Sequence, residues 1–545
     1  MKTLSVRDVI GPIMIGPSSS HTAGALRIAL MTRQMLGAEP RTVEFRLYGS
    51  FCHTYQGHGT DKALVAGMLG LAPDDERIRT SFELAAEAGL AFTFTPLPNA
   101  ETRHPNTVDI LVTSADDSQL SVRGESIGGG AAVISAINGV EVQLTGEHHS
   151  IVTEQRDVQG VLAHITACLN AANINIATVR LFRTKKGQTA YTVIETDEEL
   201  PAHLAEAILL NPNITSVNVI RSEKVDDESQ RRAVDDAAQA TWHGRPLPAF
   251  DEVDYPDGAA LLAYCRENEL PISDAICVRE RALLLRDGLH TDSTSEYLDD
   301  VLDVMRAAAT GPLSEPRASM GGLIGGEARK LMDLWGSGEG LRDELMAKAA
   351  IYSMAVLETN ASMGKIVAAS TAGSSGVIPG VLFALQDVHG FSHERLHRAL
   401  ANAAAVGYLI ARNATVSGAE GGCQAEVGSA SAMAASAACE LLGGTPEQCL
   451  GAASIAIAGL LGLVCDPIAG LVEAPCQKRN ATGAVNALVS AQIALAGCTD
   501  LVDFDQTVEA MYQVGRALPF ELRESALGGL AATPAACAFC ESCRR

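Results

Sequence analysis

Residues 150–181 read SIVTEQRDVQGVLAHITACLNAANINIATVRL, and this stretch decides the fold of the middle of the chain. Here and in the residues that follow, alternating runs predict four strands, and apolar residues at helical spacing predict two helices. In chain order, these elements cover residues 150–153, 161–172, 174–181, 190–195, 204–210 and 217–220. The order strand–helix–strand–strand–helix–strand predicts a ferredoxin-like α+β unit over residues 148–222.

The pattern changes on both sides of this unit. Before it, alternating strand segments and a small-residue helix over 22–36 predict an α/β domain that covers residues 1–147. After it, residues 223–257 begin with a charged stretch that is poor in apolar residues, which predicts a linker. From 258 to 545 the apolar spacing is helical and is broken by glycine-rich turns, so we expect an all-α domain.

Composition excludes several classes of function. The formal net charge of -24 opposes binding to nucleic acid and to acidic lipid surfaces. Arg7 and Asp8 stand where a signal peptide needs its apolar core, and the apolar run 452–464 is too short to span a bilayer. We therefore expect a cytoplasmic protein without membrane or nucleic-acid partners. The odd number of cysteines, 13, favours reduced thiols over a disulfide framework.

Three of the cysteines differ from the others in their surroundings. Cys423, Cys465 and Cys476 each have a glycine or a proline within two residues, which predicts that each thiol lies on a turn. Thiolates on turns can converge on a metal, although these three form no CxxC pair. Since an iron–sulfur cluster normally takes four cysteines, three ligands would leave one iron open as a Lewis acid.

Two segments predict binding of a carboxylate. Ser18, Ser19 and Ser20 precede His21 and a helix, and hydroxyl and N–H groups at a helix start suit an anion. The loop 370–376 predicts a nest of N–H groups, with Gly321–Glu327 as a similar glycine-rich break. The simpler alternatives are a serine helix cap beside a surface histidine, and helix kinks that glycine permits.

Other polar or glycine-rich breaks complete the set of candidates. His58 lies between two glycines, Asn106 follows a His-Pro pair, and Ser126 opens a glycine-rich stretch. The motifs are GPSSSHTAG (16–24), GHGTD (57–61), HPN (104–106), SIGGG (126–130), TAGSSGVIPG (371–380), EGGCQAE (420–426), CDP (465–467) and PCQKRNATGA (475–484).

Together, and in this order, these motifs resemble the iron–sulfur-dependent bacterial L-serine dehydratases over nearly the whole chain. The resemblance implies a β portion at 1–147 fused to an α portion from 258. It also implies a [4Fe–4S] cluster on Cys423, Cys465 and Cys476. The substrate would be L-serine and the assembly a homodimer.

Residue roles follow from the same resemblance. We expect His58 as the base with His21 nearby. Asn106, Ser126 and the two carboxylate segments would contact the substrate. In this set of predicted substrate contacts, the serine segment contributes Ser18, Ser19 and Ser20, and the second loop contributes Thr371, Ala372, Gly373, Ser374 and Ser375.

The turn before Gly160 and the phrase at 173–176 resemble ACT domains, which often bind an amino acid at a subunit interface. The alternative is a purely structural dimerisation module. The sequence also leaves open whether a tail thiol (Cys537, Cys540 or Cys543) reaches the open iron.

Four other functions fit parts of the sequence. A pyridoxal phosphate dehydratase would use Ser126–Gly130 for phosphate and Lys365 for the Schiff base. A serine hydrolase would use Ser362 with Lys365, in an S-x-x-K pattern that lacks its usual companion motifs. The third is cysteine desulfidation at the same cluster. The fourth is a non-enzymatic amino-acid sensor built on the ACT-like unit and the cluster.

Overall fold

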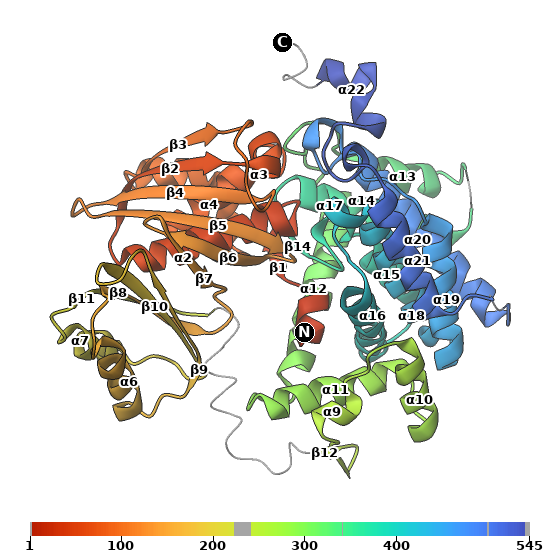
Figure 1. Ribbon diagram of the computed structural model, residues 1–545. Helices are drawn as coiled ribbons and strands as arrows, with labels where there is room; N and C mark the ends of the chain where they lie inside the picture. Colours follow the sequence, from red (N-terminus) through yellow and green to blue (C-terminus); the bar gives the residue numbers. More distant parts are fainter. Residues whose placement is uncertain (1–2, 223–240, 341, 499–500, 540–545) are drawn as a thin grey trace. The chain divides into compact units, whose positions relative to one another are not determined.

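The computed structural model describes residues 3–222, 241–340, 342–498 and 501–539. It divides into two compact units, one formed by residues 20–231 and the other by residues 1–19 together with 232–545. The first unit holds the two large sheets, and the second is built mainly from helices (Figure 1). No helix in the described part of the chain is both long enough and apolar enough to cross a bilayer. The predicted mixed α/β chain with a helical C-terminal region is confirmed.

The first unit begins with a six-stranded sheet in the order β3-β2-β4-β5-β6-β7, in which only β2 and β3 are parallel. Helices α2 and α4 pack together, and α2 packs on strands β4, β5 and β6. The strands are β2 (Pro40–Leu47), β3 (Ala91–Pro96), β4 (Thr107–Ser114), β5 (Gln119–Gly128), β6 (Ala131–Ile137) and β7 (Val140–Leu144). The helices are α2 (Gly24–Leu36), α3 (Gly49–Thr54), α4 (Thr60–Leu69) and α5 (Ser81–Glu87).

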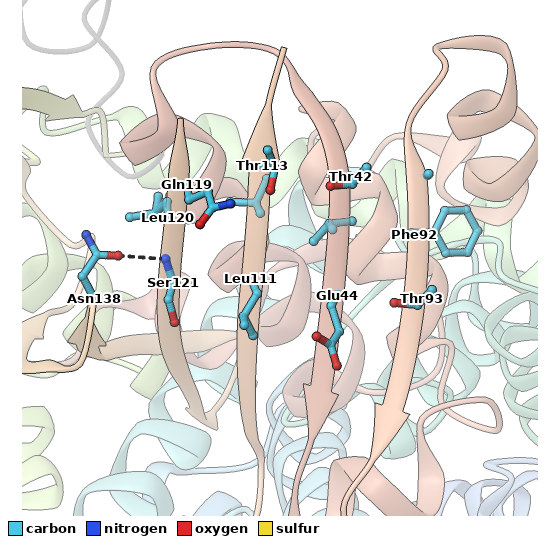
Figure 2. A pocket seen from close by; sticks show the side chains of 13 residues that line it. Thr42, Glu44, Phe92, Thr93, Leu111, Thr113, Gln119, Leu120, Ser121 and Asn138 are labelled. Atoms are coloured by element: carbon cyan, nitrogen blue, oxygen red, sulfur yellow. Dashed lines mark hydrogen bonds between the residues drawn. The ribbon is translucent and has the colours of Figure 1, made fainter. Parts of the chain in front are cut away.

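The two faces of this sheet differ in chemistry. In β2, Val43, Phe45 and Leu47 are buried, whereas the alternate residues Thr42 and Glu44 are at least partly exposed. Such alternation is expected of a sheet with one face on a core. Figure 2 shows the partly exposed face, where a hollow of about 580 Å³ crosses four strands. Polar and apolar residues line it in nearly equal numbers.

The ferredoxin-like unit forms as predicted. Its four strands make an antiparallel sheet in the order β11-β8-β10-β9, with two helices covering one face. The elements are β8 (His149–Arg156), α6 (Val161–Ala171), β9 (Ile176–Arg183), β10 (Thr189–Thr196), α7 (Ala202–Leu209) and β11 (Ile214–Ile220). Ile151, Ile165, Ile194 and Leu204 meet in its core. The helical and alternating apolar periods that predicted these elements therefore point into one core.

The helical unit is built around α18 (Ser429–Leu441), whose residues are buried except for Glu440. This helix packs on α15, α16, α19 and α20. Its sequence SASAMAASAACEL consists mostly of small residues, and small side chains let neighbouring helices approach closely. The other long helices are α10 (Gly258–Asn268), α11 (Ile272–Arg286), α12 (Ser293–Ser314), α13 (Glu327–Gly336), α14 (Glu344–Ala361), α15 (Val377–His389), α16 (His393–Asn413), α19 (Pro446–Leu460), α20 (Ala474–Leu495) and α21 (Phe504–Ala517).

The first residues of the chain belong to the helical unit. Strand β1 (Ile13–Ile15) pairs antiparallel with β14 (Lys365–Val367). The short helix α1 (Val6–Val9) packs on α16, and the buried Glu280 accepts a hydrogen bond from the N–H of Val6 at 3.0 Å. Within its described residues, the predicted all-α domain therefore contains one strand, because β14 finds its partner more than 300 residues earlier.

The sequence places residues 1–147 in one domain, whereas residues 1–19 group with the helical unit. Most of the predicted linker, residues 223–240, lies outside the described residues. Its described end holds the hairpin β12 (Thr241–Trp242) and β13 (Arg245–Pro246), followed by α9 (Phe250–Val253), which packs on α11. The remaining boundaries stay predictions.

Candidate metal centre and histidine site

Three buried cysteines converge in the helical unit. Cys423 precedes the π-helical turn Gln424–Gly428 that leads into α18, and Cys465 lies between α19 and α20. Cys476 lies in the first turn of α20. Gly422, before Cys423, has φ +76, and a Cβ there would meet the carbonyl oxygen of Leu463 at 2.9 Å. A larger residue is therefore excluded at the turn that presents Cys423.

The thiols act on one another electrostatically. A hydrogen bond with Cys423, followed by burial, raises the pKa of Cys465 well above its ordinary value. Burial and then the charge of Cys423 raise the pKa of Cys476 in the same way. Arg479 is a nearby cation, with Nη1 3.9 Å from the Sγ of Cys423 and 2.7 Å from Asp466. Three adjacent thiolates need more positive charge than this, and a thiophilic metal centre would supply it.

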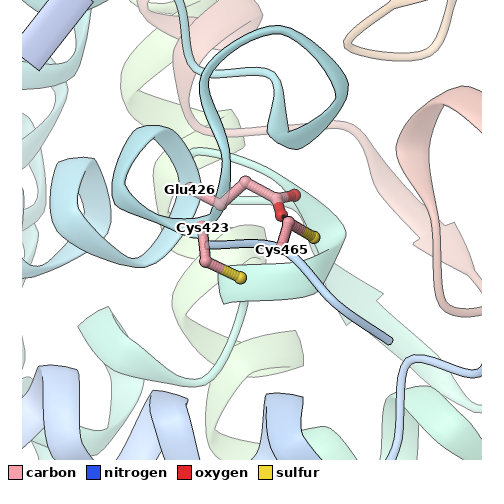
Figure 3. Close-up of side chains that lie close together, drawn as sticks. All are labelled: Cys423, Glu426 and Cys465. Atoms are coloured by element: carbon pink, nitrogen blue, oxygen red, sulfur yellow. Dashed lines mark hydrogen bonds between the residues drawn. The ribbon is translucent and has the colours of Figure 1, made fainter. Parts of the chain in front are cut away.

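Glu426 joins this group, although the sequence patterns assign it no role. Figure 3 shows its carboxylate beside Cys423 and Cys465. One ligand atom from each of these three residues lies within 4.8 Å of the others. Burial raises the pKa of Glu426, and burial followed by the charge of Glu426 raises that of Glu524 to about 8. The only signal in the sequence was the position of Glu426 three residues after Cys423.

The predicted loop at 370–376 lies beside the cysteines. The hydroxyl of Thr371 donates to Oε1 of Glu426 at 2.8 Å. Asn480, which the sequence analysis missed, donates through Nδ2 to the carbonyl oxygens of Gly373 (2.8 Å) and Cys476 (2.9 Å). Ala372 and Gly373 open a short 3₁₀ helix, so their N–H groups lack an acceptor within that helix. Two of the predicted features, the loop and the thiols, thus form one site.

The second glycine-rich break serves a different purpose. The carboxylate of Glu473 accepts from the N–H of Gly321 (2.6 Å), the N–H of Leu323 (3.0 Å) and the hydroxyl of Ser319 (2.6 Å). This break therefore binds a carboxylate of the chain itself. Because Glu473 precedes α20, the contact also fixes the start of the helix that carries Cys476.

In the first unit, the two predicted histidines lie together. The rings of His21 and His58 have centroids 4.4 Å apart, and both side chains are buried. His21 has Nδ1 2.8 Å from the hydroxyl of Ser20 and Nε2 2.8 Å from that of Ser50. Neither ring nitrogen of His58 has a hydrogen-bond partner among the described residues. An unsatisfied buried imidazole marks a site where a ligand group can bind.

The other predicted residues of this unit lie close to His21. Ser126 donates from its hydroxyl to the carbonyl oxygen of Ser20 at 2.7 Å, and its N–H donates to the carbonyl oxygen of Asn106 at 3.0 Å. Ser50 was missed because it lies in α3, 29 residues from His21, and carries no motif of its own. Ser18 and Ser19 are buried and belong to the other unit.

Burial sets the protonation of both histidines. It lowers the pKa of His58 from 6.5 to about 4. Burial first, and then the charges of His58 and His104, hold the pKa of His21 well below its ordinary value. Both rings are therefore neutral at neutral pH, as a proton acceptor must be.

The lowered pKa of His58 predicts acid sensitivity. Between pH 6.5 and about 4 the unfolded chain binds a proton at His58 that the folded chain does not, so stability falls as pH falls. From about pH 7.5 to about pH 5, this histidine is expected to lower the free energy of unfolding by about 2 kcal/mol. Urea unfolding of the chain and of His58→Asn at both pH values measures this.

The comparison with the variant is needed because Asp61 acts in the opposite direction. Burial raises its pKa to about 6, so its contribution to stability grows as pH falls through that value. The decrease in the free energy of unfolding of the parent chain minus the decrease for His58→Asn gives the contribution of His58 alone. Equal losses in the two proteins would contradict the prediction.

Comparison with known proteins identifies the family. Residues 5–136 match the model of the serine dehydratase beta chain, and residues 196–531 match that of the serine dehydratase alpha chain. An L-serine dehydratase of Streptomyces coelicolor is 33% identical over 97% of this chain and 98% of its own length. L-serine dehydratase 2 of Escherichia coli is 30% identical over 98% of this chain and all of its own length. A probable L-serine dehydratase alpha chain of Bacillus subtilis is 46% identical over 50% of this chain and 90% of its own length. The chain therefore belongs to the serine dehydratase family and carries the beta-chain and alpha-chain regions in one polypeptide.

Proposed function

We propose that this chain converts L-serine to pyruvate and ammonia by eliminating water across Cα and Cβ, at a [4Fe–4S] cluster held by Cys423, Cys465 and Cys476. The family and the full-length similarity to proteins named L-serine dehydratase support the reaction. The observation that carries the site is the convergence of three buried thiols beside the loop at 370–376.

The residues present fit such a cluster. All three donors are soft sulfur ligands from separate turns, and the raised pKa values of Cys465 and Cys476 indicate that their thiolate forms need a nearby cation. When a cluster is bound by three cysteines, the iron without a protein ligand can act as a Lewis acid toward a hydroxyl group. Arg479 would offset part of the negative charge that the thiolates contribute.

The elimination also needs a base for the Cα proton. We assign this role to His58, whose ring nitrogens have no hydrogen-bond partner among the described residues and whose lowered pKa keeps the ring neutral, so that one nitrogen can accept a proton. His21 is held at both nitrogens by Ser20 and Ser50, so it is suited to positioning the adjacent His58 ring. A neutral imidazole accepts the proton from carbon without first losing one of its own.

The substrate carboxylate needs hydrogen-bond donors. We assign Thr371, Ala372, Gly373, Ser374 and Ser375 to it, because this loop pairs a hydroxyl with N–H groups of an unpaired first helical turn. The proposed contacts from the remaining predicted positions are Ser18, Ser19, Ser20, Asn106 and Ser126. After elimination, the aminoacrylate would hydrolyse in water to pyruvate and ammonia without help from the chain.

The ferredoxin-like unit is proposed to be an ACT-like domain through which two chains form a homodimer. Its strand β9 lies at the edge of the sheet, where backbone N–H and C=O groups remain available for pairing. Val179 and Leu181 on this strand are 40% and 44% exposed. An edge strand with exposed apolar side chains is suited to contact with a second copy.

Anaerobic purification tests the proposed function. The full chain is expected to contain about four iron and four sulfide per polypeptide and to release pyruvate from L-serine. Exposure to air should remove iron and activity together, because an open iron is accessible to oxygen. A preparation without iron that is fully active, or activity that air does not change, would contradict the proposal.

A further inference from the structure

Glu426, Cys423 and Cys465 form a group of ligands that differs from the proposed cluster set. One ligand atom from each lies within 4.8 Å of the other two, and Cys476 is not part of this group. Cys423 and Cys465 are buried, the hydroxyl of Thr371 donates to Oε1 of Glu426, and Glu524 is an acidic neighbour of that carboxylate. The other oxygen, Oε2, lies 3.9 Å from the Sγ of Cys465.

These separations suit a single ion. With zinc–sulfur bonds of about 2.3 Å, two sulfurs on one tetrahedral zinc lie roughly 3.8 Å apart. In a [4Fe–4S] cluster each cysteine binds a different iron, so the sulfurs lie farther apart than two ligands of one ion. The group of two thiols and a carboxylate therefore has the spacing of a mononuclear site.

We propose that the cluster-free chain binds one thiophilic divalent ion, zinc above all, through Cys423, Cys465 and Glu426. Binding forms two metal–sulfur bonds and one metal–oxygen bond, and the protons held by the thiols and the carboxyl group pass to solvent. Two thiolates and a carboxylate on a dication leave one negative charge, and Arg479, which also pairs with Asp466, offsets part of it. A fourth position stays open to water, as in zinc sites with three protein ligands.

A consequence follows for cluster insertion. Zinc binds such donors more tightly than ferrous iron does. An ion on Cys423 and Cys465 would occupy two of the three thiolates that the cluster needs. Zinc is therefore expected to slow reconstitution of the enzyme, and this competition, unlike the binding itself, rests on the proposed function.

Cobalt(II) titration of the reduced, cluster-free, full-length chain tests the ligand set. In the parent and in every variant that is titrated, Cys540 and Cys543 of the tail are replaced by serine. Their CxxC spacing would otherwise let them bind metal separately. We expect one cobalt per chain, with thiolate-to-cobalt charge transfer and intense visible bands of a tetrahedral ion. One equivalent of zinc should displace it.

Four variants separate the two ligand sets. Cys423→Ser and Cys465→Ser should abolish the charge-transfer band, and Glu426→Gln should weaken cobalt binding at least about tenfold. Cys476→Ser should bind cobalt within about twofold of the parent. Circular dichroism confirms that each variant is folded. Loss of the band in Cys476→Ser with full binding in Glu426→Gln would overturn the proposal, as would a parent that binds no cobalt.

The same variants keep this inference distinct from the proposed function. Cys476→Ser should lose cluster iron and activity after reconstitution while its cobalt binding persists. If Cys476→Ser instead keeps both iron and activity, the cluster assignment fails and the cobalt result still stands. If reconstitution proceeds normally in the parent but cobalt does not bind, the mononuclear site fails alone.

Discussion

Replacing His58 with asparagine is expected to lower kcat for L-serine at least about a hundredfold and to leave the iron content unchanged. The substitution removes the proposed acceptor of the Cα proton. Both nitrogens of this buried ring lack partners in the described structure, so no hydrogen bond between side chains is lost with it. Steady-state kinetics with iron analysis of the same anaerobic preparations measures both quantities.

The control is His203→Asn, which makes the same change on an exposed position of α7. It should match the parent in kcat, KM and iron. Near-normal turnover by His58→Asn with full iron would remove the base assignment. A variant that loses iron and activity together would show that His58 supports the structure of the chain and is not the base.

Replacing Cys465 with serine is expected to remove most of the iron and to lower activity at least about a hundredfold. The site would lose one of its three thiolate ligands, and no neighbouring group can take the place of that ligand. The nearest candidate, Glu426, provides a harder oxygen ligand that iron–sulfur clusters rarely use. Iron and sulfide analysis, visible absorbance and the pyruvate assay report the outcome.

Cys498→Ser serves as the matched control, because Cys498 is exposed at the end of α20 and lies outside the proposed ligand set. It should retain iron and activity. If Cys465→Ser also retains both, the ligand set is wrong.

Local patterns in the sequence predicted much of the fold. The ferredoxin-like unit was predictable because each of its strands and helices shows its own apolar period, and Ile151, Ile165 and Ile194 then share one core. Strand β1 was not predictable in this way. Its three residues gain stability only from β14, and nothing near Ile13 indicates a partner at Val367.

The residues of the site differ in the same way: local sequence patterns predicted some of them and could not predict others. Turns drew attention to the three cysteines, and the family resemblance selected them. Glu426, Asn480 and Ser50 contribute through contacts with residues that lie 29 or more positions away, such as Thr371 for Glu426. Ordinary polar residues of this kind acquire a role only when the fold brings them beside a partner.

The pairing of β1 with β14 has a consequence for any version of this protein that is made as two polypeptides. A break between Ser222 and Thr241 would leave Ile13–Ile15 on one piece and Lys365–Val367 on the other. The helical piece would then lack its strand partner and the N–H that Glu280 binds at Val6. The helical piece would need the other piece to complete its small sheet, so the two would associate through this N-terminal arm. Keeping both in one chain makes that association intramolecular and independent of protein concentration.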